Sequence, residues 1–169
     1  MNAHLASTTR RVGRAVVAAI ALALAGCGDK ESKQTAATGV FVGRVAASQA
    51  YIALVSDGKR VTGYLCDSRK LATWLADANL DSSRTTLRSR AGDRLGVAVV
   101  EQGAAAGWVV IDGKTHTFRA TPASGDAGLY CLGKRAWIKL ADRSVRGTDV
   151  HPMQTFKDSK PVTSFPDAA

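Results

Sequence analysis

Short apolar runs separated by turn residues fill the middle of the chain, from Gly39 to Leu140. Such runs, recurring roughly every 8 to 12 positions, are typical of an all-β sandwich or barrel. The runs are Val40–Ala46, Tyr51–Ser56, Val61–Cys66, Thr85–Ser89, Leu95–Glu101, Gly107–Asp112, Thr115–Ala120, Gly128–Leu132 and Ala136–Leu140. The pattern therefore predicts an all-β domain.

Two connections between these runs carry a specific hairpin signal. Asp57-Gly58 and Asp112-Gly113 each stand between β-prone flanks. The Asp-Gly pair tolerates the positive φ angles of a type I′ turn, which joins adjacent antiparallel strands. Short links of this kind predict that successive strands are neighbours, as in a meander.

One segment departs from the strand pattern. In Ser68–Leu80 the apolar residues Leu71, Trp74, Leu75 and Ala78 recur at spacings of three and four. This spacing is typical of an amphipathic helix, and Asp67 or Ser68 could cap its N-terminus. The sequence thus predicts one short helix that covers an edge or end of the sheet, with Trp74 in the core.

About eight antiparallel strands within residues 39–142 predict a small up-and-down β-barrel. The alternative is a β-sandwich, which needs a long crossover that only the helical segment could supply. Several candidates for the interior are small, namely Ala53, Gly63, Gly96 and Ala98. They suit either a narrow filled barrel or one that leaves room for a ligand. The last segment, 143–169, contains three of the four prolines and is expected to be an extended or disordered tail.

The N-terminus has the parts of an export signal. Arg10, Arg11 and Arg14 precede the uncharged run Ala15–Ala25, which is too short to span a bilayer core of about 30 Å as a helix. The run ends in Leu24-Ala25-Gly26-Cys27, which resembles the lipobox of bacterial lipoproteins. That resemblance implies a signal peptide over 1–26 and a lipid on Cys27. A flexible tether over 27–38 would then hold an extracytoplasmic body at the cell membrane.

The body also resembles a known class of modules. The stretch YIALVSDGKRVTGYLCD (Tyr51–Asp67), followed by the expected helix that contains Trp74 and Leu75, is similar to small secreted β-barrel modules of unassigned function. The resemblance implies a barrel and no known active residues.

The chain contains three cysteines. Once Cys27 is lipidated, Cys66 and Cys131 remain as a pair, which in an oxidising compartment predicts a disulfide. The alternatives are a metal site that adds His116, or two free thiols. No CxxC or HxxxH spacing favours the metal.

The chain is basic, with 23 Lys and Arg against 14 Asp and Glu, a formal charge of +9. Without the three leader arginines the mature chain has 20 against 14, a charge of +6. This favours an anionic neighbour such as a phospholipid headgroup, an acidic envelope polymer or an acidic protein face. A basic solvated surface is the alternative, and nucleic acid is not expected beside an exported chain.

The motifs of enzymes are incomplete in this chain. Gly128–Arg135 has the glycine spacing of a phosphate-binding loop but ends in arginine and joins two predicted strands. Ser56 and Lys59 match the S-x-x-K of serine acyl-enzymes, yet they flank a tight turn. His116 and His151 have no local catalytic partners. We therefore expect no catalytic residue, no cofactor and no metal.

The sequence thus predicts a non-catalytic envelope lipoprotein that binds a small ligand, an envelope polymer or a protein. One alternative is an inhibitor or assembly factor of an envelope enzyme, although basic targets would repel a basic body. Another is a hydrolase whose active site is assembled from distant residues.

Overall fold

The structure is a computed structural model, and it describes residues 37–81, 84–92, 94–100, 103–148 and 158–162. These residues all belong to one unit of the chain, residues 32–169. The predicted signal peptide, the lipid site at Cys27, nearly all of the tether and most of the predicted tail lie outside the described residues.

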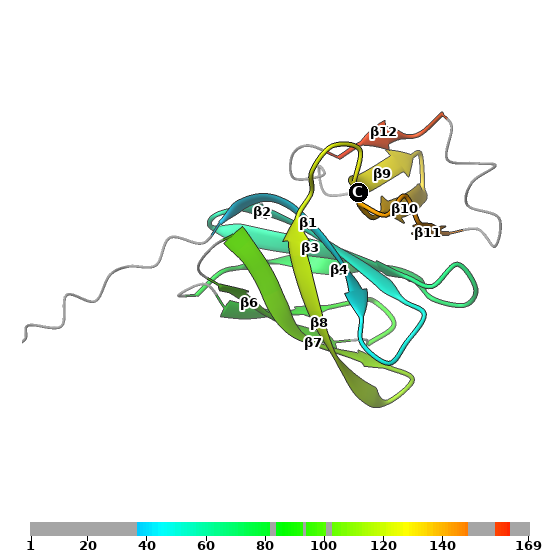
Figure 1. The fold of residues 1–169 in the computed structure, drawn as a ribbon. Helices are drawn as coiled ribbons and strands as arrows, with labels where there is room; N and C mark the ends of the chain where they lie inside the picture. Colours follow the sequence, from blue (N-terminus) through cyan, green and yellow to red (C-terminus); the bar gives the residue numbers. More distant parts are fainter. Residues whose placement is uncertain (1–36, 82–83, 93, 101–102, 149–157, 163–169) are drawn as a thin grey trace, which may run out of the picture. The chain divides into compact units, whose positions relative to one another are not determined.

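Eight strands form one antiparallel sheet (Figure 1). They are β1 (Thr38–Val45), β2 (Tyr51–Asp57), β3 (Arg60–Cys66), β4 (Ala72–Asn79), β5 (Arg84–Arg88), β6 (Arg94–Val100), β7 (Ala104–Ile111) and β8 (Lys114–Pro122). Their order is β4-β3-β2-β1-β8-β7-β6-β5, so the first strand pairs with the last. A bridge between Leu75 and Ser89 links β4 to β5 and nearly closes the ring. The prediction of an eight-stranded up-and-down barrel is confirmed.

The two predicted Asp-Gly hairpins both form. Asp112 and Gly113 have φ angles of 50° and 74°, as a type I′ turn requires of its two central residues. In the other hairpin only Gly58 has a positive φ, of 85°. There the Asp57 carboxylate accepts hydrogen bonds from the backbone N–H groups of Lys59 and Arg60, and these bonds stabilise the turn.

The predicted helix over 68–80 is wrong, because the segment forms β4. Leu75 lies inside the barrel, whereas its neighbour Trp74 packs on Tyr64 with ring centroids 5.0 Å apart. Both faces of the strand are therefore partly covered. A bulge places Leu75 opposite Gly63 but Ala78 opposite Val61, which inserts an extra residue into β4. This step of three residues, following the step of four from Leu71, imitates helical spacing.

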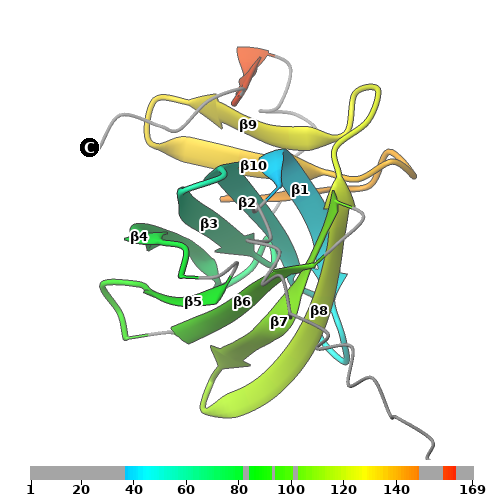
Figure 2. The same cartoon turned by 90° about the vertical axis from the view of Figure 1, so that its left-hand side faces the viewer.

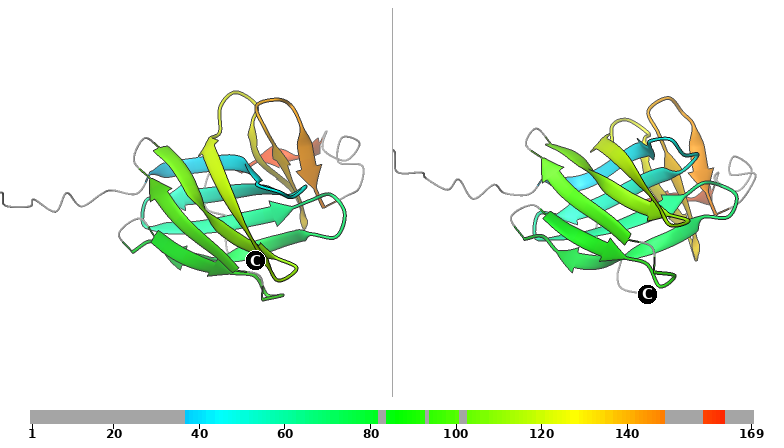
Figure 3. Two further views of the ribbon diagram at one scale, coloured as in Figure 1. Left: turned by 60° about the horizontal axis from the view of Figure 1, so that its bottom comes forward. Right: turned by 90° about the horizontal axis from the view of Figure 1, so that it is seen from below.

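Four further strands form a separate small sheet. They are β9 (Gly128–Leu132), β10 (Arg135–Lys139), β11 (Val145–Gly147) and β12 (Lys160–Pro161), in the order β11-β10-β9-β12. The predicted runs 128–132 and 136–140 are thus strands, but they do not belong to the barrel, which ends at Pro122. Two strands also lie within the segment predicted as a tail. Figure 2 shows both sheets, and Figure 3 shows how the eight strands curl around their axis.

Large apolar side chains are buried inside the barrel. They form one buried cluster: Phe41, Val45, Ala50, Ile52, Leu54, Val61, Leu65, Leu75, Leu87, Leu95, Ala105, Val109, Phe118 and Ala120. These large buried side chains favour a packed core, and Ala53, which was expected inside, belongs instead to a cluster on the outer face. Gly63 allows Leu75 and Leu54 to pack closely, because a Cβ at position 63 would lie only 3.1–3.2 Å from their side chains.

A second buried cluster joins the outer face of β1, β2 and β3 to the small sheet. Its members are Val42, Tyr51, Ala53, Val55, Tyr64, Cys66, Ala127, Leu129, Ala136, Ile138 and Leu140. Hydrogen bonds complete the junction. The Tyr64 hydroxyl donates to the Ala136 carbonyl at 3.2 Å, and the Gly147 N–H donates to the Ser68 hydroxyl at 2.9 Å. The small sheet therefore covers one wall of the barrel.

Candidate functional site

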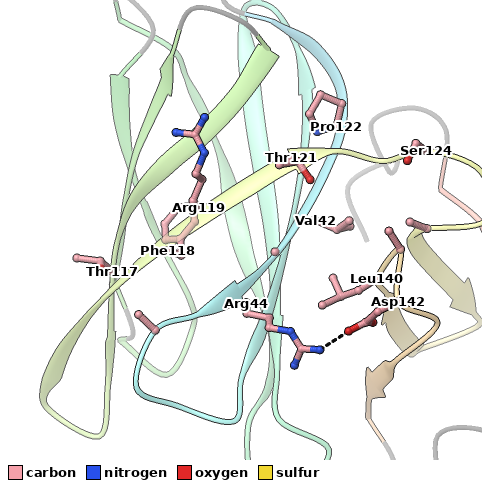
Figure 4. Close-up of a pocket in the computed structure, with 14 residues that line it drawn as sticks. Val42, Arg44, Thr117, Phe118, Arg119, Thr121, Pro122, Ser124, Leu140 and Asp142 are labelled. Atoms are coloured by element: carbon pink, nitrogen blue, oxygen red, sulfur yellow. Dashed lines mark hydrogen bonds and ion pairs between the residues drawn. The ribbon is translucent and has the colours of Figure 1, made fainter.

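A groove lies on the outer wall of the barrel (Figure 4). It has a volume of about 710 Å³. The outer faces of β1 and β8 form one side, and the segment that follows β10 forms the other. Its lining residues are Val42, Gly43, Arg44, Ala46, Thr117, Phe118, Arg119, Thr121, Pro122, Ser124, Ala127, Leu140, Ala141 and Asp142.

The lining combines apolar and polar groups. Val42 and Leu140 are buried and supply apolar surface from the two facing sides. Thr121 and Ser124 are exposed and bring hydroxyl groups to the rim. Such a mixture of apolar area and a few polar groups is typical of sites for small ligands.

An ion pair bridges the two sides of the groove. The Arg44 guanidinium lies 2.5 Å from the Asp142 carboxylate and also donates to the Ser144 hydroxyl at 3.2 Å. The Tyr51 hydroxyl donates to the same Ser144 oxygen at 2.9 Å. Both Arg44 and Arg146 lie over the Tyr51 ring, at 4.8 and 5.1 Å from its centroid, which is within cation–π range.

The pKa values follow from these contacts. Hydrogen bonds from the side chain and backbone of Ser144, followed by that from Arg44, lower the pKa of Asp142 from 3.8 to about 2. The hydrogen bond with Asp142 raises the pKa of Arg44. Both groups are therefore charged at neutral pH, and Asp142 is suited to hold Arg44 rather than to accept a proton.

Arg119 stands apart from this pair. It lies directly opposite Arg44 in the β1–β8 ladder, but Figure 4 shows its side chain pointing away from Arg44 and Asp142. Within the described residues its guanidinium takes part in no ion pair or side-chain hydrogen bond. It thus offers an uncompensated positive charge beside the groove.

The cysteines predicted to pair are both free thiols in the structure. Cys66 is fully buried at the end of β3, and Cys131 is half-buried on β9. Both contribute to the junction between the barrel and the small sheet. Burial raises the pKa of each thiol, so neither is activated as a nucleophile.

The other singled-out residues have structural contacts. Ser56 is buried, and its hydroxyl accepts a hydrogen bond from the Gly58 N–H inside the turn. His116 Nδ1 lies 3.0 Å from the Ala46 carbonyl oxygen. Gly128–Arg135 spans the β9–β10 hairpin, where no helix follows to complete a phosphate loop. His151 lies outside the described residues.

The described part of the chain contains neither a candidate membrane-spanning helix nor a cluster of metal-ligating side chains. None of its residues belongs to a helix that is long and apolar enough to span a membrane. In the same part, no three His, Cys, Asp or Glu side chains gather as metal ligands would.

Reasoning from sequence did not find the groove residues. Arg44 and Asp142 are 98 positions apart, and no local pattern marks either of them. Arg119 carried a weak signal, because it is a charged residue between the apolar residues Phe118 and Ala120 of the strand KTHTFRATP.

Comparisons of this chain with protein-family models, with curated proteins and with solved structures found no match.

Proposed function

We propose that this chain is a non-catalytic binding module of the cell envelope, tethered to a membrane through a lipid on Cys27. It binds a small amphipathic ligand in the groove between β1, β8 and the segment after β10. Support for the anchor is the sequence Leu24-Ala25-Gly26-Cys27 behind a short apolar run.

The observation that carries the proposal is that large apolar side chains are buried together inside the barrel, while a groove is open on its outside. A carrier that held its ligand inside the barrel would need a cavity where Ile52, Leu54 and Leu65 pack. The outer groove instead offers apolar surface from Val42 and Leu140. Arg119 and the hydroxyl groups at the rim suit a ligand with an anionic or hydrogen-bonding head.

The non-catalytic part of the proposal rests on the state of the reactive groups. The Asp142 carboxylate is held in an ion pair, and its lowered pKa makes it a poor general base. The thiols of Cys66 and Cys131 are buried or half-buried and have raised pKa values.

A groove-filling substitution tests the proposed site. Thr121→Trp places an indole in the groove, whereas Thr115→Trp places one on the same face of β8 outside it. Wild-type protein and both variants are screened by thermal shift against medium-chain fatty acids and acyl phosphates. We expect Tm to rise with at least one of these amphiphiles in the wild type and in Thr115→Trp, but not in Thr121→Trp. A rise that survives in Thr121→Trp, or no rise with any amphiphile, contradicts the site.

The anchor has an independent test. Mass spectrometry of protein purified from its native membranes should find a chain that begins at Cys27 and carries fatty acyl mass. A chain that keeps Met1 and has no acyl mass contradicts the anchor without affecting the groove.

A further inference from the structure

The outer wall opposite the small sheet presents a second face, which shares only Thr117 and Arg119 with the groove. It is formed by the outward residues of β5 to β8, which lie side by side as one wall (Figure 2). We call it the tryptophan–arginine face and define it by Arg84, Thr86, Arg88, Gly96, Trp108, Thr117 and Arg119. The register places Thr86, Gly96, Trp108 and Thr117 in one row across the four strands.

Trp108 is the centre of this face. It is 38% exposed, and the only other large apolar side chain with comparable exposure in the described part of the chain is Leu132. Its indole lies over Gly96, since a Cβ at that position would come within 2.3 Å of two indole atoms. The absence of a side chain at Gly96 therefore allows the Trp108 ring to pack against the β6 backbone.

Positive charge flanks the indole on both sides. Arg84 and Arg88 are exposed on β5, two strands away from Trp108, and Arg119 is exposed on β8, the next strand on the other side. Among the described residues, none of these three guanidinium groups takes part in an ion pair or a side-chain hydrogen bond. They contrast with Arg44, Arg60 and Lys139, which are paired with aspartates.

We propose that the tryptophan–arginine face binds an anionic polysaccharide. The face of an indole carries negative charge density, which attracts the weakly positive C–H groups on one side of a sugar ring. Thr86 and Thr117, in the same row as Trp108, can exchange hydrogen bonds with sugar hydroxyl groups. Arg84, Arg88 and Arg119 pair with the acidic groups of neighbouring sugars, because a guanidinium binds a carboxylate or phosphate with two parallel hydrogen bonds.

The geometry favours a polysaccharide over a membrane surface. A membrane-docking face exposes several large apolar side chains that enter the headgroup region, whereas among the described side chains of this face the exposed large apolar one is Trp108, which lies on a glycine. The choice of a polysaccharide over a single-stranded nucleic acid, which also uses aromatic rings and arginines, rests on the proposed export of the chain.

The test is a titration of the full chain at low salt, followed by tryptophan fluorescence. The probe is sodium polygalacturonate, and dextran is its uncharged control. Vesicles of phosphatidylglycerol and phosphatidylcholine, and oligothymidylate, represent the other two classes of anion. We expect polygalacturonate to bind and to change the fluorescence, added salt to weaken the binding, and dextran, vesicles and oligothymidylate to bind at least about tenfold more weakly.

Two pairs of variants locate the site. Trp108→Ala should weaken polygalacturonate binding about tenfold or more, whereas Leu132→Ala removes the other exposed apolar side chain and should change it less than about twofold. The double variant Arg84→Ala/Arg88→Ala should also weaken binding about tenfold. Its control, Lys134→Ala/Arg135→Ala, removes the same charge from two exposed residues at the end of the β9–β10 hairpin. Circular dichroism confirms that each variant is folded.

Trp108→Phe provides a second readout if Trp108→Ala does not fold. It keeps an aromatic ring, so binding should persist within about threefold. The fluorescence change should disappear, because the remaining indoles, of Trp74 and Trp137, are half-buried and fully buried.

Three outcomes overturn the proposal. They are the absence of polygalacturonate binding, binding that Trp108→Ala and Arg84→Ala/Arg88→Ala leave unchanged, and tighter binding of vesicles or oligothymidylate through the same residues. None of them bears on the thermal-shift test of the groove or on the mass of the Cys27 terminus. A failure of this face is therefore distinguishable from a failure of the proposed function.

Discussion

Two parts of the barrel's outer wall differ in what covers them. The small sheet covers the outer face of β1, β2 and β3, whereas the outer face of β5 to β8 is open. On β2, six consecutive residues from Tyr51 to Ser56 are buried, because the interior covers one face and the small sheet covers the other. On β8 burial alternates, with Phe118 and Ala120 inside and Arg119 exposed between them. Continuous burial marks the covered wall, and alternation marks the open one.

This difference separates the parts of the molecule that stabilise it from those that can bind. The covered wall carries aliphatic side chains and tyrosines, and the Tyr64 hydroxyl donates a hydrogen bond to the Ala136 carbonyl of the small sheet. The open wall carries arginines without described partners and an exposed indole. The groove lies where the two walls meet, with Arg44 on one side and Asp142 on the other.

The largest effect is expected where the small sheet packs on the barrel. Leu129 is fully buried on β9, and Leu132 is 43% exposed on the same strand. Leu129→Ala should lower the free energy of unfolding by about 3 kcal/mol, because it leaves a cavity in the junction. Leu132→Ala should change it by less than about 0.5 kcal/mol. Urea unfolding measures both, and equal costs would mean that the small sheet does not stabilise the barrel.

Gly147 packs against a buried indole and Gly96 against an exposed one, so the cost of adding a methyl group at each position can be compared. A Cβ at Gly147 would come within 2.0 Å of the Trp137 ring, and one at Gly96 within 2.3 Å of the Trp108 ring. Trp137 is fully buried and cannot move aside, so Gly147→Ala should cost about 2 kcal/mol. Trp108 can swing into solvent, so Gly96→Ala should cost less than about 1 kcal/mol and shift the tryptophan emission to the red. Thermal melts and fluorescence spectra check both. A larger cost at Gly96 would show that its indole is held as firmly as that of Trp137.

The two thiols should differ in reactivity. Both are free, but Cys66 is fully buried in the junction and Cys131 is half-buried. Under native conditions iodoacetamide should modify Cys131 at least about tenfold faster than Cys66, which reacts only when the junction opens. Peptide mass spectrometry measures the two rates. If neither thiol reacts until a reductant is added, the two cysteines form a disulfide, contrary to the structure.

The smallest effect concerns the exposed ion pair at the groove. The pKa of Asp142 falls from 3.8 in the unfolded chain to about 2 in the folded one. A lowered pKa contributes stability above the unfolded value, and this contribution is lost as the pH falls through about 2. Asp142→Asn should therefore cost a small, constant amount of stability between pH 5 and 8, and the difference should vanish near pH 2. Urea unfolding of both proteins across this range measures it. A difference that persists at the acid end would assign the effect to something other than the carboxylate charge.

The sequence predicted the barrel because hairpin turns and strand runs are local signals. Asp112-Gly113 requires only its own backbone angles to form the turn, and each apolar run needs only a covered face. The helix prediction failed for a reason outside the segment. The bulge opposite Val61 and Gly63 sets the spacing of apolar residues on β4, and that pairing is not visible in residues 68–80 alone.

The second sheet and the groove could not be predicted from local patterns, because both depend on contacts between segments that are far apart in the sequence. The continuous runs at Tyr51–Ser56 and Val61–Cys66 were a usable sign that something covers the outside of β2 and β3. The covering strands β9 and β10 were predicted as strands, but nothing in them indicates a separate sheet. The Arg44–Asp142 pair depends on how that sheet docks, which only the folded chain specifies.

The most direct test of where this protein binds is a ¹H–¹⁵N NMR titration of the full chain with sodium polygalacturonate. We predict that the indole N–H of Trp108 and the backbone amides of Thr86, Gly96 and Thr117 shift, while those of Leu54 and Leu65 inside the barrel do not. Shifts concentrated on the interior residues, with the Trp108 signal unchanged, would contradict the account.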